Sequence, residues 1–356
     1  MFHKSTFLIL IISLMGFKLS AQRDTMSKIN FSVYGDVYYS YDFSEPYGNE
    51  KPAFIYNHKR HNEVNANLLI LKAAYKDTIT RGNLALMAGN YPQYNLSHEP
   101  LWASFIYEAN VGVKLNKRRQ LWLDAGIFPS HIGFESAISA DCWTLTRSIL
   151  AENSPYYEAG IRLSNTNKNE NFYWALMALN GWQTIQRPPG INTPSFGLQL
   201  NYKIKEKLTL NYSNFVGSTQ PDSNKAIRTF HNLYLQYESG NKWGAIAGFD
   251  IGSDKIANGT YSTWYSPVVI VRYAVNKKIK AAIRGEYYYD KNQIIITTQT
   301  ANGFQVMGYS ANLDFNITEG VLFRIEGKLY HSKDPIFKNN TSNNFALTSS
   351  LTYKID

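Results

Sequence analysis

The chain has 356 residues, a net charge of +9, one cysteine and an aromatic share of 15%. One cysteine excludes a disulfide within the chain, and after the N-terminal segment no run of about 18 apolar residues could cross a membrane as a helix. The basic excess suits an anion pathway or an acidic surface, whereas the export signal described next makes nucleic acid an unexpected partner.

The N-terminus has the features of a secretory signal peptide. Lys4 precedes an apolar run over residues 7–17, and small residues stand just before Gln22. This pattern predicts a signal peptide over residues 1–21. Residues 22–356 contain no composition shift or Pro-rich linker, so we expect a single domain there.

Alternating apolar and polar residues dominate the rest of the chain. Over residues 30–43, Phe31 and Val33 begin one face, and Ser32 and Tyr34 begin the other. A period of two places successive side chains on opposite faces of a β-strand. The same alternation recurs along the chain and predicts about sixteen strands of roughly nine to fourteen residues.

One predicted strand breaks the pattern. Between Val64 and Tyr75, alternate residues are apolar through Leu68 and Ile70, until Lys72 falls on the same side. We expect Leu68 and Ile70 to share the apolar outer face. A β-bulge in this strand would then restore the register.

The connections alternate between short polar turns and long loops. The long ones are expected near residues 44–62, 92–103, 129–155, 183–194, 217–228, 252–262, 290–302 and 332–343. This arrangement predicts an all-β fold, a transmembrane antiparallel β-barrel with turns on one rim and loops on the other. A soluble sandwich or propeller is the alternative, but its turns would recur every 8 to 12 residues or so.

The third long loop, residues 129–155, carries its own apolar stripe of Ile138, Cys142, Leu145 and Ile149. This spacing predicts a short helical segment. If the loop folds inward, its charges would form a pore constriction, with Arg147 paired to Glu158 or Glu108. The constriction charges are Glu135, Asp141, Arg147 and Glu152. A solvated helix outside the pore is the alternative.

Charged residues on the polar side of the strands are expected to face the lumen. They are Glu108, Lys114, Asp124, Glu158, Arg162, Arg284, Glu286, Arg324 and Glu326. We expect most of them to be satisfied by neighbouring groups and water rather than to select solutes.

The wording of three segments carries a resemblance to a known family. The sequences GIFPSHIGFESAI and WTLTRSILAENSPYYEAGIRL fall within residues 126–163, and ALNGWQTI covers residues 178–185. These segments resemble the OmpL-like β-barrel porins of Gram-negative outer membranes. The resemblance implies an outer-membrane channel without catalytic residues.

Two functions follow as alternatives. The first is a porin with a water-filled channel for passive diffusion of small hydrophilic solutes or ions; the second is an adhesin-like or structural barrel with a plugged lumen. No catalytic, metal or cofactor motif is present, so we expect no enzyme. The expected partners are outer-membrane lipid, the solutes or ions, the barrel-insertion machinery during assembly and, as an open alternative, further copies of the chain.

Overall fold

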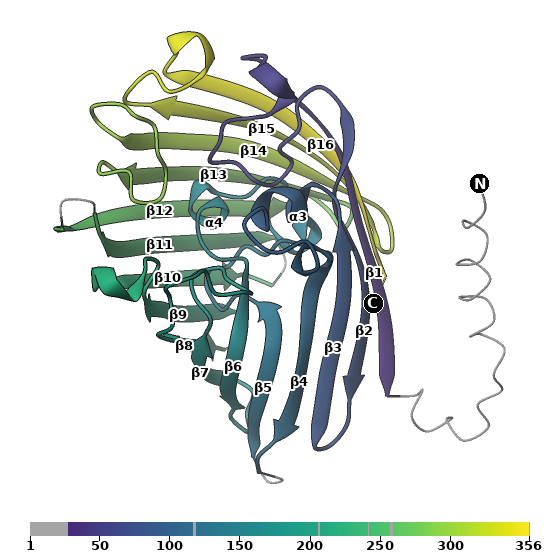
Figure 1. The fold of residues 1–356 in the computed structure, drawn as a ribbon. Helices are drawn as coiled ribbons and strands as arrows, with labels where there is room; N and C mark the ends of the chain where they lie inside the picture. The colour runs from purple at the N-terminus through teal and green to yellow at the C-terminus, as the bar shows by residue number, and fades with distance from the viewer. Residues whose placement is uncertain (1–27, 117–118, 206, 241, 257–258, 356) are drawn as a thin grey trace, which may run out of the picture.

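The computed structural model describes residues 28–116, 119–205, 207–240, 242–256 and 259–355. The predicted signal peptide, residues 1–21, lies outside the described residues. Sixteen antiparallel strands form a closed barrel in which consecutive strands pair and β1 pairs with β16 (Figure 1). This result confirms the predicted all-β antiparallel barrel and its strand number.

The strands are β1 (Ile29–Asp42), β2 (Val64–Lys76), β3 (Thr80–Ala88), β4 (Ile106–Lys114), β5 (Gln120–Pro129), β6 (Tyr157–Thr166), β7 (Phe172–Leu179), β8 (Ser195–Ile204), β9 (Leu208–Gly217), β10 (Arg228–Glu238), β11 (Trp243–Lys255), β12 (Tyr261–Ala274), β13 (Ile279–Asp290), β14 (Phe304–Thr318), β15 (Val321–Ser332) and β16 (Asn343–Ile355). The helices are short: α3 (Asn90–Asn95), α4 (Ile149–Glu152), and the 3-10 turns η2 (Tyr47–Asn49), η3 (Ala103–Phe105), η4 (Ser139–Asp141), η5 (Asp222–Asn224) and η6 (Lys338–Asn340). Among the described residues, no helix is long and apolar enough to cross a membrane.

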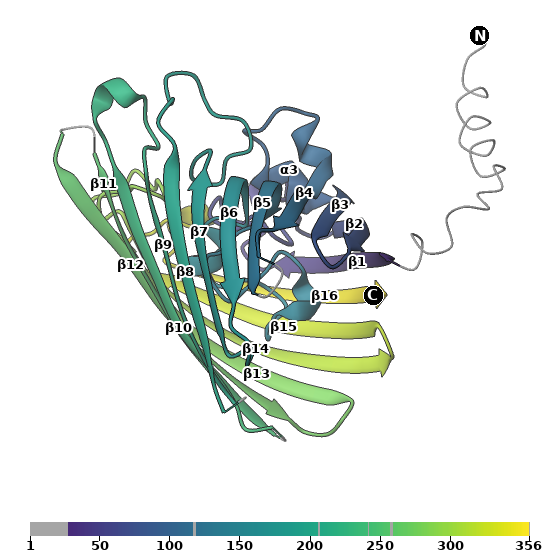
Figure 2. The same ribbon diagram turned by 90° about the horizontal axis from the view of Figure 1, so that it is seen from below.

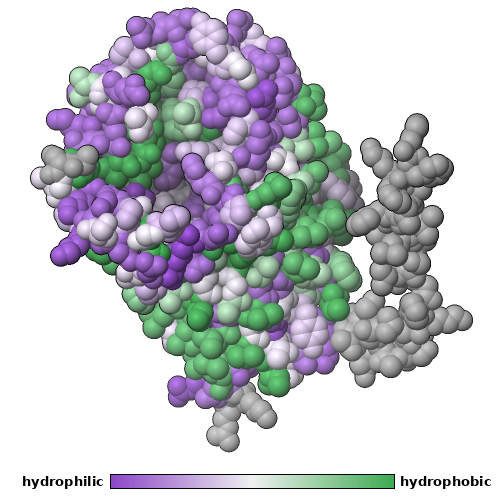
Figure 3. All heavy atoms as spheres, in the orientation of Figure 1, coloured by the Kyte–Doolittle hydropathy of each residue, from purple (hydrophilic) through white to green (hydrophobic). Residues whose placement is uncertain are grey.

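The two faces of each strand differ in polarity. In β1, Val33 and Val37 are exposed, whereas Asp36 and Ser40 are fully buried. The same alternation continues around the barrel, and Figure 3 shows hydrophobic side chains gathered over the outer wall of β2–β6 and hydrophilic ones over the loops. The outer face is therefore apolar and the interior is lined largely by polar groups, as in barrels that cross a membrane.

The predicted bulge in β2 lies earlier than the sequence pattern suggested. Asp36 pairs with Leu68 and Val37 pairs with Ala66, so Asn67 is the additional residue. The bulge turns Leu68 and Ile70 inward, where both are buried. The expectation that these two residues share the outer face is therefore wrong; a register shift of one residue exchanges the faces of a strand.

The two rims of the barrel carry connections of different length. The long loops are named L1 (residues 43–63), L2 (89–105), L3 (130–156), L4 (180–194), L5 (218–227), L7 (291–303) and L8 (333–342). The connection between β11 and β12, residues 256–260, is shorter than predicted because both strands extend toward it. The start of β1 and the end of β16 lie side by side on the short-turn rim, since Val33 pairs with Ile355 (Figure 2).

L3 lies inside the barrel (Figure 1). Near its start it contacts interior-facing side chains of β9 and β10. Further on it contacts those of β13–β16, across the barrel from β5 and β6. In a closed barrel, a loop reaches these groups only from within the lumen. The predicted short helical segment is present as the single turn α4 and the 3-10 turn η4. The backbone between them is irregular, so the apolar stripe of L3 does not lie on one continuous helix.

Candidate functional site

A network of four charged residues crosses β14 in the barrel interior. Arg284 on β13 donates through Nη2 to Glu326 Oε1 on β15 at 2.9 Å. Glu286 on β13 lies 2.8 Å from the Nζ of Lys328 on β15. All four side chains are at least nine-tenths buried, so each charge requires its partner.

Small residues on β14 make room for this network, because β14 lies between β13 and β15. Gly308 faces Glu286 across the strand pair, and a Cβ atom at Gly308 would lie 2.6 Å from Glu286 Oε1. Ser310 stands opposite both Arg284 and Lys328. The network therefore depends on the absence of larger side chains on the intervening strand.

The same carboxylates bind the backbone of L3. Glu286 Oε2 accepts a hydrogen bond from the Ile149 N–H, and Glu326 Oε2 accepts one from the Thr146 N–H, both at 2.6 Å. These are backbone donors that a helix would satisfy internally. Barrel side chains replace the helical hydrogen bonds here, which explains why the apolar stripe of L3 is not one continuous helix.

Arg147 is a fully buried internal brace of L3. Its guanidinium donates to three carbonyls of the loop, those of Ser136 (2.5 Å), Leu145 (2.8 Å) and Ala137 (2.9 Å). Its own carbonyl accepts a hydrogen bond from Lys328 Nζ at 2.8 Å. The predicted pairing of Arg147 with Glu158 or Glu108 is therefore wrong, because the loop backbone already uses its donors.

The other three predicted constriction charges differ in exposure. Glu135 is buried, accepts a hydrogen bond from the Ser148 N–H at 3.0 Å and lies 3.5 Å from Arg284 Nη1. Glu152 is buried and accepts the Tyr56 N–H of L1 at 2.9 Å, and burial raises the pKa of its carboxyl. Asp141 keeps 44% of its side chain exposed and pairs with Lys354.

Glu108 and Glu158 have separate partners on the β4–β6 side. Lys72 donates to Glu108 at 2.7 Å. His131, the second residue of L3, places Nδ1 2.8 Å from a Glu158 carboxylate oxygen and Nε2 2.7 Å from the Asn214 carbonyl. Burial disfavours the charged ring, but the Glu158 carboxylate outweighs it and raises the pKa of His131. Both ring nitrogens face acceptors, so the imidazolium fits this site.

Arg324 fastens L3 to β15. It pairs with Asp314 on β14 at 2.7 Å and donates to the Ser139 carbonyl at 2.6 Å. Its Nη2 also donates to the Cys142 carbonyl at 3.0 Å. The side chain is fully buried, so this arginine is a structural anchor of the loop.

Two arginines share one carboxylate nearer the short-turn rim. Arg81 donates to both oxygens of Asp124 at 2.6 and 2.5 Å, and Arg162 Nε lies 3.5 Å from the same carboxylate. Lys114 stands 5.6 Å from the ring centre of Trp122. Because two guanidinium groups face a single carboxylate, this part of the interior is positively charged.

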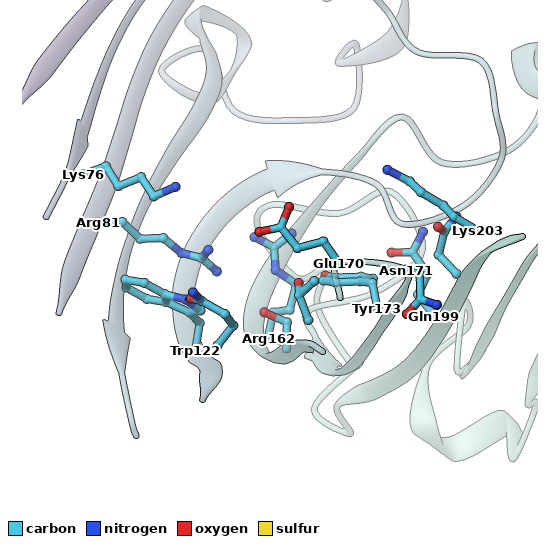
Figure 4. A pocket seen from close by; sticks show the side chains of 13 residues that line it. Lys76, Arg81, Trp122, Arg162, Glu170, Asn171, Tyr173, Gln199 and Lys203 are labelled. Carbon is cyan, nitrogen blue, oxygen red and sulfur yellow. The ribbon is translucent and has the colours of Figure 1, made fainter. Parts of the chain in front are cut away.

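A cavity of about 550 Å³ opens beside these arginines at the short-turn end of the interior. We call it the vestibule; its charged lining residues are Lys76, Arg81, Arg162, Glu170 and Lys203. Figure 4 shows Lys76 and Arg81 pointing into the space that Arg162 and Lys203 border from the other side. Among the described lining residues Glu170 is the one carboxylate, so the vestibule is suited to anions.

A layer of aromatic side chains fills the interior at the long-loop end. Its strand members are Phe215, Phe230, Trp264, Tyr288, Phe304 and Tyr330, each near the long-loop end of its strand. Loops L1, L4 and L8 add Phe54, Trp182 and Phe337. Ring centres lie as close as 4.8 Å for Phe54 and Phe304. This layer narrows the barrel above L3.

Sequence reasoning missed the vestibule. Lys76, Arg81 and Lys203 were not among the predicted lumen-facing residues, although Lys203 continues the alternation of β8. Arg81 was not recognised as a lumen-facing residue because β3 begins only at Thr80, directly after a turn. The proximity of basic residues to both ends of the short turns was the signal that could have identified this site.

The family described as "Putative beta-barrel porin-2, OmpL-like" matches residues 28–355. The chain belongs to this family. The match spans the whole barrel and confirms the resemblance carried by residues 126–163. A porin-like barrel of the OmpL-like family implies an outer-membrane location, and the porin family and fold are those of channels rather than enzymes. No curated protein matches this sequence.

Solved porins share the fold of this OmpL-like barrel. An anion-selective porin from Comamonas acidovorans has 10% identity and a TM-score of 0.59, covering 92% of this chain and 99% of that chain. OmpF of Salmonella typhi, in complex with daunomycin, has 12% identity and a TM-score of 0.61, covering 92% and 97%. OmpT of Vibrio cholerae in its trimer form has 9% identity and a TM-score of 0.56, covering 92% and 99%. At these sequence identities, the similarity between this chain and the solved porins is a similarity of fold.

Proposed function

We propose that this protein is a porin of the Gram-negative outer membrane that passes small hydrophilic solutes by diffusion and prefers anions. The observation that carries the anion preference is the basic vestibule, in which Lys76, Arg81, Arg162 and Lys203 line one cavity. Sixteen strands are enough to enclose an aqueous channel. We assign no enzymatic activity to the barrel.

L3 and the interior charges belong to the same proposal. In this view L3 is the constriction, and Asp141, the most exposed of its four charges, contributes most directly to the local field. Glu135, Arg147 and Glu152 act by fixing the path of the loop. Because OmpT is described in a trimer form, assembly of this chain into a homo-oligomer in outer-membrane lipid, after delivery by the insertion machinery, is part of the proposal.

Reversal potentials in a planar bilayer under a potassium chloride gradient test the channel and its preference. The unmodified barrel is expected to conduct with an anion preference, and Lys203→Glu combined with Lys76→Glu is expected to shift that preference toward cations. Lys333→Glu is the matched control, because Lys333 is an exposed residue at the start of L8 on the opposite rim. Unchanged selectivity in the double variant would remove the vestibule from the ion path.

A second function, a closed barrel that binds partners through its loops, is favoured by the aromatic layer at the long-loop end. The layer joins strands β9, β10 and β12–β15 to L1, L4 and L8 in one cluster. A silent bilayer, together with a heat-dependent gel shift showing that the barrel is folded, would support this function and overturn the channel.

A further inference from the structure

A second pocket lies at the opposite end of the barrel from the vestibule. It has a volume of about 350 Å³ and lies between L1, L7, L8 and the start of β14. We call it the outer pocket. The lining residues used below are Lys51, Phe54, Thr297, Phe304, Phe337 and Lys338. All three loops lie on the long-loop rim of the barrel (Figure 1). The pocket that they line therefore stands at the entrance of the barrel.

Lys51 is the unusual member of this lining. It is only 4% exposed, and within the part of the chain that the structure describes its ammonium makes neither a hydrogen bond nor an ion pair. Its backbone N–H donates to the Lys59 carbonyl at 3.0 Å, so its position in L1 is fixed. Burying an unpartnered ammonium is unfavourable, and such groups are normally paired. Among the residues that the structure describes, none lies close enough to be such a direct partner.

The electrostatic surroundings leave this ammonium charged at neutral pH. Burial lowers the pKa of Lys51 to about 8, opposed by Asp42 on β1, Glu152 on α4 and Glu326 on β15, and reinforced by Lys328 on β15. Below that pH the group is a cation that faces the pocket.

The remaining walls divide into an apolar and a polar side. Phe54 and Phe304 meet with their ring centres 4.8 Å apart, and Phe337 lies 6.4 Å from Phe54. On the polar side, Lys338 Nζ stands 4.5 Å from the ring centre of Tyr47, and the exposed Thr297 offers a hydroxyl.

The carboxylate in the lining does not neutralise Lys51. Glu50 pairs with Arg60 at 3.2 Å and accepts a hydrogen bond from the Tyr94 hydroxyl at 2.8 Å. Both partners lie outside the pocket lining. The pocket therefore combines an available cation with an aromatic wall.

We propose that the outer pocket binds a small organic anion, with its carboxylate on the ammonium of Lys51 and its apolar body against Phe54 and Phe304. The volume lies at the small end of the range for ligand pockets, which suits a molecule with one ring. This proposal goes beyond diffusion through the vestibule, because it assigns a saturable site at the entrance of the barrel.

The test uses the full barrel folded in detergent, with benzoate as the probe and benzamide as its neutral counterpart. Binding is measured by calorimetric titration and by saturation-transfer NMR of the probe. Benzoate is expected to bind saturably, and benzamide at least about tenfold more weakly, the loss expected for one hydrogen bond to a charged group. This comparison needs no variant.

Two variants locate the site. Lys51→Met keeps most of the aliphatic stem and removes the charge, and it is expected to weaken benzoate binding by about tenfold or more. Lys333→Met, at an exposed lysine of L8 outside the pocket lining, is expected to bind benzoate like the unmodified barrel. Folding of each variant is checked by its heat-dependent gel shift.

Three results would overturn the proposal: no saturable benzoate binding, equal binding of benzoate and benzamide, or unchanged affinity in folded Lys51→Met. These measurements do not depend on conduction. A barrel that is silent in a bilayer yet binds benzoate through Lys51 would refute the channel and support the outer pocket. A barrel that conducts ions but does not bind benzoate would support the channel and refute the outer pocket.

Discussion

The guanidinium of Arg284 donates to the carboxylate of Glu326 at 2.9 Å although the two residues stand on strands that are not neighbours. The bond crosses β14 in the barrel interior. Both residues also bind L3: Arg284 Nη1 donates to the Thr146 carbonyl, and Glu326 accepts the Thr146 N–H. The pair therefore couples the barrel wall to the loop within its lumen.

Replacing Arg284 with Met should destabilise the barrel and release L3. Removing one partner of a buried ion pair costs about 3–5 kcal/mol, because the remaining carboxylates keep their charge without a partner. We expect a lower urea midpoint in the heat-dependent gel shift. Lys280→Met is the matched control: this residue faces the interior from the same strand, is partly exposed and makes no ion pair with any described residue. Equal midpoints for the two variants would contradict the role of Arg284.

Gly308→Ala should destabilise the network without removing any of its charges. The new Cβ would lie 2.6 Å from Glu286 Oε1, so Glu286 must shift away from Lys328 and the Ile149 N–H. Overpacking of this kind costs about 1–3 kcal/mol. Gly285→Ala is the control, because a Cβ there meets nothing within 4 Å. The urea midpoint of Gly308→Ala should fall below that of the control, and the reverse order would count against the crossing geometry.

Arg147→Lys should loosen L3 while keeping the positive charge. A lysine ammonium lacks the planar fork that reaches three carbonyls, so we expect a loss of about 2 kcal/mol. Cys142, the one cysteine of the chain, is buried within L3 and reports the change. A maleimide reagent should modify it faster in the variant than in the unmodified barrel. If the rate is unchanged in folded protein, Arg147 is not a brace of the loop.

The anchoring of L3 at its start should weaken as pH rises. Because the pKa of His131 is raised in the folded barrel, its stabilising contribution is complete below its unfolded pKa of about 6.5 and is lost as pH rises through the folded value. The urea midpoint is expected to be higher at about pH 6 than at about pH 9, and His131→Gln should reduce that difference. A difference as large in His131→Gln as in the unmodified barrel would show that another group is responsible.

Alternation along the chain was sufficient to predict the strands, their antiparallel closure and the two kinds of rim. A strand between lipid and a polar interior must alternate, so this information is local and can be read from residues such as Val33 and Asp36. The assignment of Leu68 and Ile70 failed because a bulge can occupy several positions with the same local pattern. The pairing of β1 with β2 decided that it lies at Asn67.

The interior was decided by the tertiary structure. From the sequence, Arg147 was predicted to be a constriction charge paired with Glu158 or Glu108. In the structure it braces L3, and the backbone of this loop is held by Glu286 and Glu326, more than 100 residues later in the chain. The pocket around Lys51 likewise requires L1 to meet L7 and L8. The sequence by itself determined which residues face the lumen along most strands. Which of these residues form hydrogen bonds or ion pairs with one another was decided only by closure of the barrel around L3. The reason is that such contacts depend on distances in space that sequence separation does not specify.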